Sequence, residues 1–436
     1  MPNIAILGAG IAGLSTAYHL KSGYVLFEKE NEVGGVCRSL SRGGYTFDTT
    51  GHVLHFCTPE VANFVNQLLD GEWSETERSA WVYTKEKYIP YPFQAHFTQL
   101  SDPIRQECLS DFIEAQQNGR VPNQPIDSFQ EWILSHFGAG IANHFLIPYN
   151  TKLWGVPPKE LGVDGVQKYI PIPTLEEILS GSQRPLGYNA RFYYPRQGGI
   201  HRVALALSKK LTEPIYLNHE VEQIDLQRRK IRFRNGKEFS YHRLLSTIPL
   251  PELGKRIFPI PDNIQQLFGE LQWVSVCSFH FGIRALKERH RHWIYFAEPE
   301  YPFYRVVLPA NYAPHLAPKG NGTLQVEVPF SMERTLTSVT QTRSAVIHGL
   351  KQVGLLQDEN QIEVEESHIV RYGYAVFTRG CQEIVKTLTK FLGDHSIDLV
   401  GRYASWEYMS LEDCILAGRE VADSISHNPP PLIQSH

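Results

Sequence analysis

The stretch Ile4-Ala5-Ile6-Leu7-Gly8-Ala9-Gly10-Ile11-Ala12-Gly13 joins a short apolar run to the pattern G-x-G-x-x-G. Apolar side chains then recur at helical spacing over residues 11–20, and a second apolar run covers residues 24–27. This order predicts a strand, a tight turn, a helix and a second strand. Together these elements predict a βαβ unit that binds a dinucleotide.

Each residue of the glycine pattern has a separate expected role. Gly8 would form the tight turn, Gly10 would let the backbone approach a pyrophosphate, and Gly13 would let the helix and the strand pack closely. The pyrophosphate would then meet free N–H groups at the positive end of the helix. Glu28 ends the second strand, 20 residues after Gly8. Its carboxylate is expected to accept hydrogen bonds from the adenosine ribose.

The segment after the second strand favours FAD over NAD. Residues 28–38 read E-K-E-N-E-V-G-G-V-C-R, which resembles the E-K-x-x-x-x-G-G continuation of two-domain FAD flavoproteins. Gly34 and Gly35 would bring the backbone to the dinucleotide a second time. Arg38 would supply charge to the pyrophosphate, unless it is a solvated loop residue.

A second FAD-binding segment is predicted near the C-terminus. A buried strand over residues 397–400 ends in Gly401-Arg402, and residues 410–413 resemble a capping box at the start of the last helix. The N-terminus of a helix stabilises negative charge, and reduced flavin is anionic around N1 and O2. The two ends of the chain are therefore expected to close over the same cofactor.

The remaining sequence divides into a helical part and a strand-rich part. Residues 59–185 show helical and aromatic patterns broken by prolines, whereas strands are predicted from residue 215 on, with a type I′ hairpin at Asn235-Gly236. The fold class is predicted as α/β. It comprises a Rossmann-like FAD-binding domain (residues 1–60, 186–260 and 386–436), a helical insert lining the substrate cleft (61–185) and a β-rich, antiparallel-sheet substrate domain (261–385).

Composition limits the partners. The 436 residues are 42% hydrophobic and 20% charged with a formal net charge of −4, which does not favour nucleic acid as a partner. The sequence contains no run of about 18 apolar residues, so no membrane span is predicted. Peripheral contact with a membrane stays open. No signal peptide is predicted, which implies a cytoplasmic location. Six scattered cysteines predict reduced thiols, and no metal site is predicted.

Residues 47–56 contain the candidate flavin-proximal histidines. Gly51 permits an unusual backbone conformation beside His52. His52 would then lie near the isoalloxazine, where a histidine can donate to or exchange protons with flavin or substrate. His55 is the second candidate, and a purely structural role is the alternative for both.

Five further segments, in order along the chain, carry a family resemblance. The segments are residues 50–56 (T-G-H-V-L-H-F), 88–94 (Y-I-P-Y-P-F-Q), 148–161 (with P-Y-N-T-K-L-W-G), 304–306 (Y-R-V) and 401–409 (G-R-Y-A-S-W-E-Y-M). Together they resemble the UDP-galactopyranose mutase family, one branch of the FAD-dependent superfamily of amine oxidases and protoporphyrinogen oxidase.

The resemblance implies roles by position. Arg305 would hold a substrate diphosphate, Trp154 would pack in the sugar-nucleotide cleft, and Trp406 and Tyr408 would lie near phosphate and sugar. In the mutases, N5 of reduced flavin attacks the anomeric carbon without net redox change. A surface ion pair is the alternative for Arg305, and a core aromatic is the alternative for Trp154.

One departure leaves the function open. Pro173 stands where the mutases carry a second diphosphate arginine, and Arg191 or Arg196 would have to compensate. The first hypothesis is a mutase-like isomerase acting on a nucleotide-linked or related sugar. The second is an oxidoreductase that removes hydride from a small organic substrate, and the third is a flavin-binding protein without turnover.

The sequence thus predicts an FAD protein with a small-molecule substrate and leaves its oligomeric state open. The candidate catalytic residues are His52 and Arg305. The candidate cofactor-binding residues are Gly8, Gly10, Ile11, Ala12, Gly13, Glu28, Lys29, Gly34, Gly35, Arg38, Thr50, Gly51, His52, Val221, Gly401, Arg402 and Met409. The candidate substrate-binding residues are Trp154, Tyr149, Tyr194, Arg196, Arg305, Trp406 and Tyr408.

Overall fold

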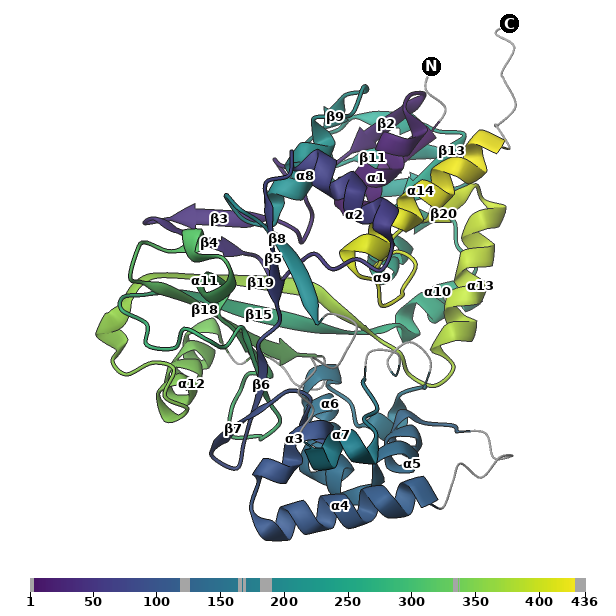
Figure 1. The fold of residues 1–436 in the computed structure, drawn as a ribbon. Helices are drawn as coiled ribbons and strands as arrows, with labels where there is room; N and C mark the ends of the chain where they lie inside the picture. Colours follow the sequence, from purple (N-terminus) through teal and green to yellow (C-terminus); the bar gives the residue numbers. More distant parts are fainter. Residues whose placement is uncertain are drawn as a thin grey trace, which may run out of the picture.

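A computed structural model describes residues 4–117, 126–163, 167, 170–180, 190–331, 336 and 338–427. In Figure 1 the first strand and the last helix lie together at one end of the molecule, a long sheet crosses the middle, and a group of helices lies at the opposite end. The predicted boundary between residues 185 and 186 lies outside the described residues.

The predicted βαβ unit forms the centre of a parallel sheet of five strands in the order β20-β13-β1-β2-β9. The N-terminal strands are short, apolar and buried, as expected for a parallel sheet covered on both faces. The five strands are β1 (Ile4–Leu7), β2 (Tyr24–Phe27), β9 (Ile215–Tyr216), β13 (Arg243–Ser246) and β20 (Ile397–Leu399). The predicted C-terminal strand therefore joins the same sheet as the first strand.

Helices from both chain ends pack on this sheet side by side. They are α1 (Ile11–Leu20) and α14 (Leu411–His427). The Ser15 hydroxyl of α1 donates to the carbonyl oxygen of Ile415 in α14 at 2.7 Å. A Cβ at Gly418 would lie 2.7 Å from the backbone nitrogen of Thr16, so a larger side chain there would push the helices apart. This contact holds the C-terminal segment against the glycine loop.

A second sheet has the order β12-β11-β10-β14 and contains the predicted hairpin. Its strands are β10 (Val221–Asp225), β11 (Lys230–Phe233), β12 (Glu238–Ser240) and β14 (Ile257–Phe258). The turn type was predicted wrongly. A type I′ turn needs positive φ at both central residues. Gly236 has a φ of 80°, but the φ of Asn235 is not positive. The Gly236 N–H donates to the Phe233 carbonyl, which closes a turn ending in a glycine bulge.

The longest sheet has seven strands in the order β19-β15-β18-β17-β16-β6-β7. Its pairs are antiparallel except for the parallel pair of β6 and β16. The strands are β6 (Ala80–Thr84), β7 (Lys87–Pro90), β15 (Gln272–Ile283), β16 (Trp293–Phe296), β17 (Arg305–Val307), β18 (Gly322–Phe330) and β19 (Ile362–Val376). β15 and β18, which lie in the strand-rich part predicted from residue 215 on, pair with each other in this sheet.

The segment predicted as helical from residue 59 is only partly so, because β6 and β7 join the long sheet. A further strand, β5 (Trp73–Glu77), pairs with β8 (Arg191–Pro195), and β3 (Ser39–Arg42) pairs with β4 (Tyr45–Asp48). Alternating polar and aromatic side chains in residues 73–90 carry the strand signal. β6 pairs with the neighbouring β7, but β16 (the other partner of β6) and β8 (the partner of β5) lie more than 100 residues away in the chain, so no local pattern reveals those two pairings.

The remaining helices surround these sheets. They are α2 (Pro59–Leu68), α3 (Phe93–His96), α4 (Asp102–Gln117), α5 (Phe129–Ile141), α6 (Ile147–Trp154), α7 (Leu175–Ser180), α8 (His201–Ser208), α9 (Leu250–Gly254), α10 (Asp262–Glu270), α11 (Pro309–Tyr312), α12 (Val339–Gln352) and α13 (Cys381–Asp394). The predicted boundaries 60/61 and 385/386 fall inside α2 and α13. The division into three units stays a prediction.

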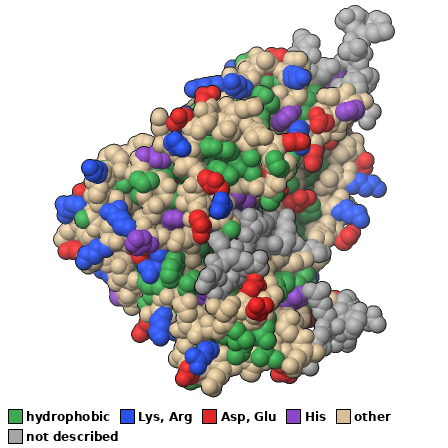
Figure 2. Space-filling model, in the orientation of Figure 1, with side chains coloured by type: hydrophobic (Ala, Val, Ile, Leu, Met, Phe, Trp, Pro, Cys, Tyr) green, Lys and Arg blue, Asp and Glu red, His purple; other side chains and the backbone are tan. Residues whose placement is uncertain are grey.

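The described surface carries both signs of charge. In Figure 2, acidic and basic side chains are interspersed over the face shown and form no single basic field among the described residues there. All six cysteines carry free thiols, as predicted. Within the described part of the chain, no helix is both long and apolar enough to cross a membrane.

Candidate active site

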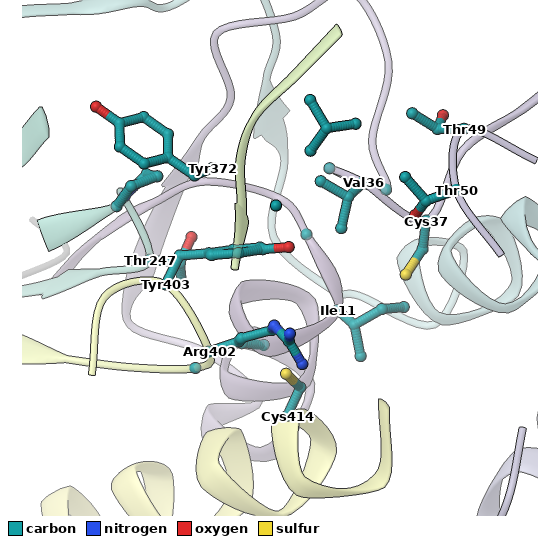
Figure 3. A pocket seen from close by; sticks show the side chains of 18 of the residues that line it. Ile11, Val36, Cys37, Thr49, Thr50, Thr247, Tyr372, Arg402, Tyr403 and Cys414 are labelled. Atoms are coloured by element: carbon teal, nitrogen blue, oxygen red, sulfur yellow. The ribbon is translucent and has the colours of Figure 1, made fainter. Parts of the chain in front are cut away.

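A cavity of about 730 Å³ is lined by the carboxyl ends of the parallel strands and by residues of the seven-stranded sheet. Ligands of open α/β sheets bind outside the carboxyl ends of the strands. Eighteen predicted residues line it together, and Figure 3 shows part of it from close by. They are Gly8, Gly10, Ile11, Ala12, Glu28, Lys29, Gly34, Gly35, Arg38, Thr50, Gly51, His52, Val221, Arg305, Gly401, Arg402, Tyr408 and Met409.

The glycine loop has the geometry that its pattern predicts. Gly8 has φ of 98°, and Gly10 caps α1 with no side-chain hydrogen bond, so the first N–H groups of the helix open onto the cavity at Ile11 and Ala12. Gly13 does not line the cavity. A Cβ there would lie 2.0 Å from the carbonyl oxygen of Gly8, so Gly13 serves the close packing of helix and turn.

Glu28, which follows β2, stabilises this loop through hydrogen bonds. The carboxylate is buried and accepts the Ala9 N–H at 2.7 Å and the Glu30 N–H at 3.0 Å. Charge-assisted hydrogen bonds of this kind are about twice as strong as neutral ones. The carboxylate therefore fixes the loop and also lies on the cavity, where the predicted ribose contact would be made.

The second glycine pair lies directly against the first loop. Gly34 donates its N–H to the Ala9 carbonyl at 2.8 Å, and a Cβ at Gly35 would lie 3.3 Å from the Cα of Gly10. Two charged residues, one before and one after this glycine pair in the sequence, also line the cavity. Lys29 and Arg38 pair with neighbouring glutamates at 3.3–3.9 Å, so part of their charge is neutralised.

The C-terminal segment closes the cavity beside α1. Gly401 has φ of 84°, and a Cβ there would lie 2.4 Å from the Cβ of Ala12. Arg402 follows, donates to the Met409 carbonyl at 2.7 Å and lies 4.3 Å from the centre of the Tyr408 ring. Figure 3 shows its side chain in the cavity beside Cys414. A buried guanidinium and open helix N–H groups together suit the anionic parts of a flavin dinucleotide.

The C-terminal helix also holds the loop that carries the histidines. Glu412, in the first turn of α14, is buried and accepts the N–H groups of Cys57 and Thr58 at 2.8 and 2.7 Å. These bonds cap α2 and fix the end of the loop that contains His52 and His55. A residue from one end of the chain thus positions residues from the other.

His52 lies on the cavity as a neutral side chain. Its Nδ1 lies 3.1 Å from the Thr50 carbonyl oxygen and 3.0 Å from the Thr50 hydroxyl. Burial is the main cause that lowers the pKa of His52 to about 4, and the nearby Arg402 and Arg305 charges act in the same direction. With Nδ1–H donating to the Thr50 carbonyl, Nε2 is left as an acceptor. His55 also lines the cavity, and burial lowers its pKa.

We therefore expect no ionisation of His52 between about pH 5 and 8, where an ordinary histidine titrates. A histidine whose pKa is lowered by folding keeps its neutral form until the pH falls well below the usual value. The measurement is a pH titration of the flavin absorbance of the wild type and of His52→Gln. A transition near pH 6.5 that is present in the wild type and absent in His52→Gln would contradict the assignment.

Arg305 on β17 belongs to a buried ion pair that the sequence did not indicate. Its Nε and Nη2 donate to Glu327 Oε2 at 2.8 and 2.5 Å, and the Tyr304 hydroxyl makes a short hydrogen bond to the same oxygen. Glu327 Oε1 accepts the N–H of Gly51 at 3.1 Å. One carboxylate therefore joins both candidate catalytic positions, Arg305 and the Gly51-His52 loop. The alternative of a surface pair is wrong, because the Glu327 side chain is only 1% exposed.

Comparison with known proteins now decides the family. The sequence profile described as flavin containing amine oxidoreductase matches residues 11–426. This chain belongs to that family. The structure is similar to that of reduced UDP-galactopyranose mutase, with a TM-score of 0.89 and 26% identity over 98% of this chain and 94% of that one.

Curated relatives match over shorter stretches. Protoporphyrinogen oxidase 2 of Arabidopsis thaliana is 25% identical over 37% of this chain and 34% of its own length. A 4,4'-diapophytoene desaturase of Staphylococcus aureus is 21% identical over 59% of this chain and 57% of its own length. The chain thus spans from about a third to just over half of these enzymes. The predicted superfamily, its mutase-like branch and the fold class are confirmed.

The predicted cofactor of this family member, FAD, is also confirmed by the flavin family assignment. The residues present fit the group. A Cβ at Gly10 would meet only the Cα of Gly35, at 3.9 Å, so the loop leaves room beside the N-terminus of α1. Glu28, Arg402 and His52, three of the residues predicted to bind FAD, line the same cavity.

Two predicted substrate residues lie behind the cavity rather than on it. Trp154 is buried, donates to Asn150 Oδ1 at 3.1 Å and packs edge-on against Tyr374 and Tyr408, with ring centres 5.8 and 6.4 Å away. Tyr149 packs edge-on against Tyr295 at 5.8 Å. These aromatic side chains support the tyrosines that line the cavity.

Three predicted substrate residues lie away from the cavity. Tyr194 is fully buried and donates its hydroxyl to Asp48 at 2.6 Å, because β8 pairs with β5 and directs this ring into the core. Arg196 is at the surface and donates to the Trp73 carbonyl at 2.7 Å. Trp406 is a core side chain with φ of 55°. None of the three is among the residues that line the cavity.

Four of the cavity-wall residues that the sequence missed bear on its chemistry. Glu327, Tyr374, Tyr295 and Arg78 come from strands or strand ends of the seven-stranded sheet. Their only local signal is an unusual polar or aromatic residue in an apolar strand. Glu327 is such a case, since it lies between Val326 and Val328 in the buried β18. A buried carboxylate in a strand needs a cationic partner, which points to an arginine nearby.

Proposed function

We propose that this protein is a mutase-like flavoenzyme that acts on a nucleotide-linked or related sugar. The observation that carries the proposal is the likeness to reduced UDP-galactopyranose mutase, which extends over 98% of this chain. In support, Arg305, His52 and Tyr408, which the resemblance aligns with mutase motifs, line one cavity.

The side chains of the cavity suit a phosphorylated sugar. When bound, the flavin supplies a ring that can act as a nucleophile when reduced or accept hydride when oxidised. Arg305, fixed by Glu327, would orient a phosphate through its remaining N–H groups. The hydroxyls of Tyr304 and Tyr374 lie 3.0 Å apart beside it. Burial raises the pKa of Tyr374 to about 12, so this hydroxyl stays protonated as a donor.

His52 would orient a hydroxyl without introducing a charge. Because its imidazole is neutral, Nε2 can accept a hydrogen bond from a hydroxyl at the reacting centre. The edge-on packing of Trp154 and Tyr149 behind Tyr408 and Tyr295 makes this wall rigid and apolar. Such a wall excludes water and strengthens the polar contacts inside the cavity.

A specific observation favours the oxidoreductase as the second candidate. The charge of Arg305 is balanced by Glu327, and Pro173 replaces the second mutase arginine, so the cationic clamp is weaker than in the mutase pattern. Loss of one charged hydrogen-bond partner costs about 1.5–3 kcal/mol of binding. A substrate without a diphosphate would not depend on that clamp.

The test is a substrate panel followed by flavin absorbance in the oxidised and the dithionite-reduced protein. The mutase-like proposal expects sugar nucleotides to bind and turn over only after reduction, with no net change of redox state. Anaerobic bleaching of the oxidised flavin by a substrate, with peroxide formed on re-aeration, would replace it with the oxidoreductase. Absence of turnover in both states across the panel would contradict both.

A further inference from the structure

Arg78 is a further arginine on the cavity wall, and no sequence motif pointed to it. It lies between β5 and β6, where its N–H donates to the Ala190 carbonyl at 2.9 Å. It lines the same cavity as His55, Trp293 and Arg305. The parallel pairing of β6 with β16 brings this segment to the wall.

Aromatic rings hold the guanidinium in place. Its central carbon lies 4.9 Å from the ring centre of Tyr91, 5.6 Å from that of Trp293 and 6.0 Å from that of Tyr295. One terminal nitrogen donates to the Tyr295 hydroxyl at 2.5 Å. An arginine stacked in this way loses little conformational freedom on binding a ligand, and its planar fork suits a two-oxygen partner.

Arg305 and Arg78 are held in the wall by different side chains. Arg305 shares the buried carboxylate of Glu327, and Arg78 is packed on aromatic rings. Burial and, to a smaller extent, the charge of Arg78 lower the pKa of His292 to about 4. Tyr295 lies within electrostatic reach of both guanidinium groups, so they flank one ring of the wall.

We propose that Arg78 binds an oxyanion group of the substrate, a phosphate or a carboxylate, and supplies the second cationic contact that Pro173 does not. The inference rests on the proposed function only in placing the substrate in this cavity. The sequence suggested Arg191 or Arg196 as the substitute for the missing mutase arginine. Arg196 lies at the surface and does not line the cavity, whereas Arg78 does.

The experiment measures binding to the FAD-loaded protein by calorimetry with UDP-glucose, UDP-glucuronate and uridine. Arg78→Met is expected to weaken the two UDP-sugars about 10- to 100-fold, the usual effect of losing a charged hydrogen-bond donor. Arg78→Lys keeps the charge and should lose less, and uridine binding should not change. Flavin content and absorbance of each variant report whether the cavity is intact.

The ligands distinguish the two sources of the oxyanion. An equal loss for both UDP-sugars assigns Arg78 to a phosphate, and a loss confined to UDP-glucuronate assigns it to a carboxylate. The control is Arg232→Met, which removes a half-exposed arginine paired with Glu222 on the four-stranded sheet. This control is expected to bind all ligands as the wild type does.

Three results would overturn the inference. They are unchanged binding in Arg78→Met, an equal loss in Arg232→Met, and failure of the wild type to bind either UDP-sugar at millimolar concentration. Turnover is scored separately in the dithionite-reduced wild type. Binding that depends on Arg78 without any turnover supports the inference while the proposed function fails.

Discussion

The Glu327→Gln variant is expected to lose about 3–5 kcal/mol of unfolding free energy, because removing one partner of a buried ion pair leaves the other charge uncompensated. Arg305 would remain buried without its carboxylate, and the short hydrogen bond from Tyr304 would lose its charged acceptor. The N–H of Gly51, which Glu327 also accepts, would lose its charged partner at the same time.

A double-mutant cycle separates this pair from the general cost of substitution. Arg305→Met combined with Glu327→Gln should lose less than the sum of the two single variants, because no unpaired buried charge remains. Urea unfolding at saturating FAD measures each step. Additive losses would show that the pair is not coupled.

A surface pair serves as the matched control for the cycle. Arg232 and Glu222 lie 3.0 Å apart with about half of each side chain exposed. Glu222→Gln should change the unfolding free energy by less than about 1 kcal/mol. A loss as large as that of Glu327→Gln would mean that burial is not the cause.

The FAD half of the site was predictable because its residues are close in sequence. Gly8, Gly10, Gly13 and Glu28 form one unit of fewer than 30 residues, and each has a backbone or hydrogen-bond requirement that few residue types meet. The C-terminal closure was also predictable, since a buried strand that ends in Gly401 directly before a capped helix is a local pattern.

The substrate half was less predictable because distant strands build it. Arg78 reaches the cavity only because β6 pairs with β16, and Arg305 is held by Glu327 from the next strand. Strand pairing of this range is not encoded in any window of the sequence. The error at Asn235-Gly236 has a different cause, since the same dipeptide fits both a two-residue turn and a longer turn that ends in a glycine bulge.

Trp154 shows how a motif can indicate a region and leave the role of its side chain undetermined. The resemblance placed it at the substrate cleft, and it lies one layer behind, where it supports Tyr374 and Tyr408. An aromatic residue that packs against two ligand-facing tyrosines is constrained as strongly as one that touches the ligand. Residue type alone therefore did not distinguish the two positions.

The second large effect is expected from the glycine loop, where one alanine substitution should weaken FAD binding and another should destabilise the fold. Gly10→Ala should leave the fold intact, because Gly10 has φ of −75° and the nearest atom to its new Cβ would be 3.9 Å away. The methyl group would occupy the path of the pyrophosphate. FAD affinity should fall about 100-fold or more, equivalent to about 2.7 kcal/mol.

Gly13→Ala should instead damage the fold itself. Its Cβ would lie 2.0 Å from the Gly8 carbonyl oxygen, and neither backbone can move without shifting α1 from β1. We expect a loss of about 3 kcal/mol of unfolding free energy even without added FAD. FAD titration and urea unfolding, at zero and saturating FAD, separate the two cases because cofactor binding adds stability only to the folded state. A Gly10→Ala protein that binds FAD normally, or a Gly13→Ala protein of wild-type stability without FAD, would contradict the division of roles within the loop.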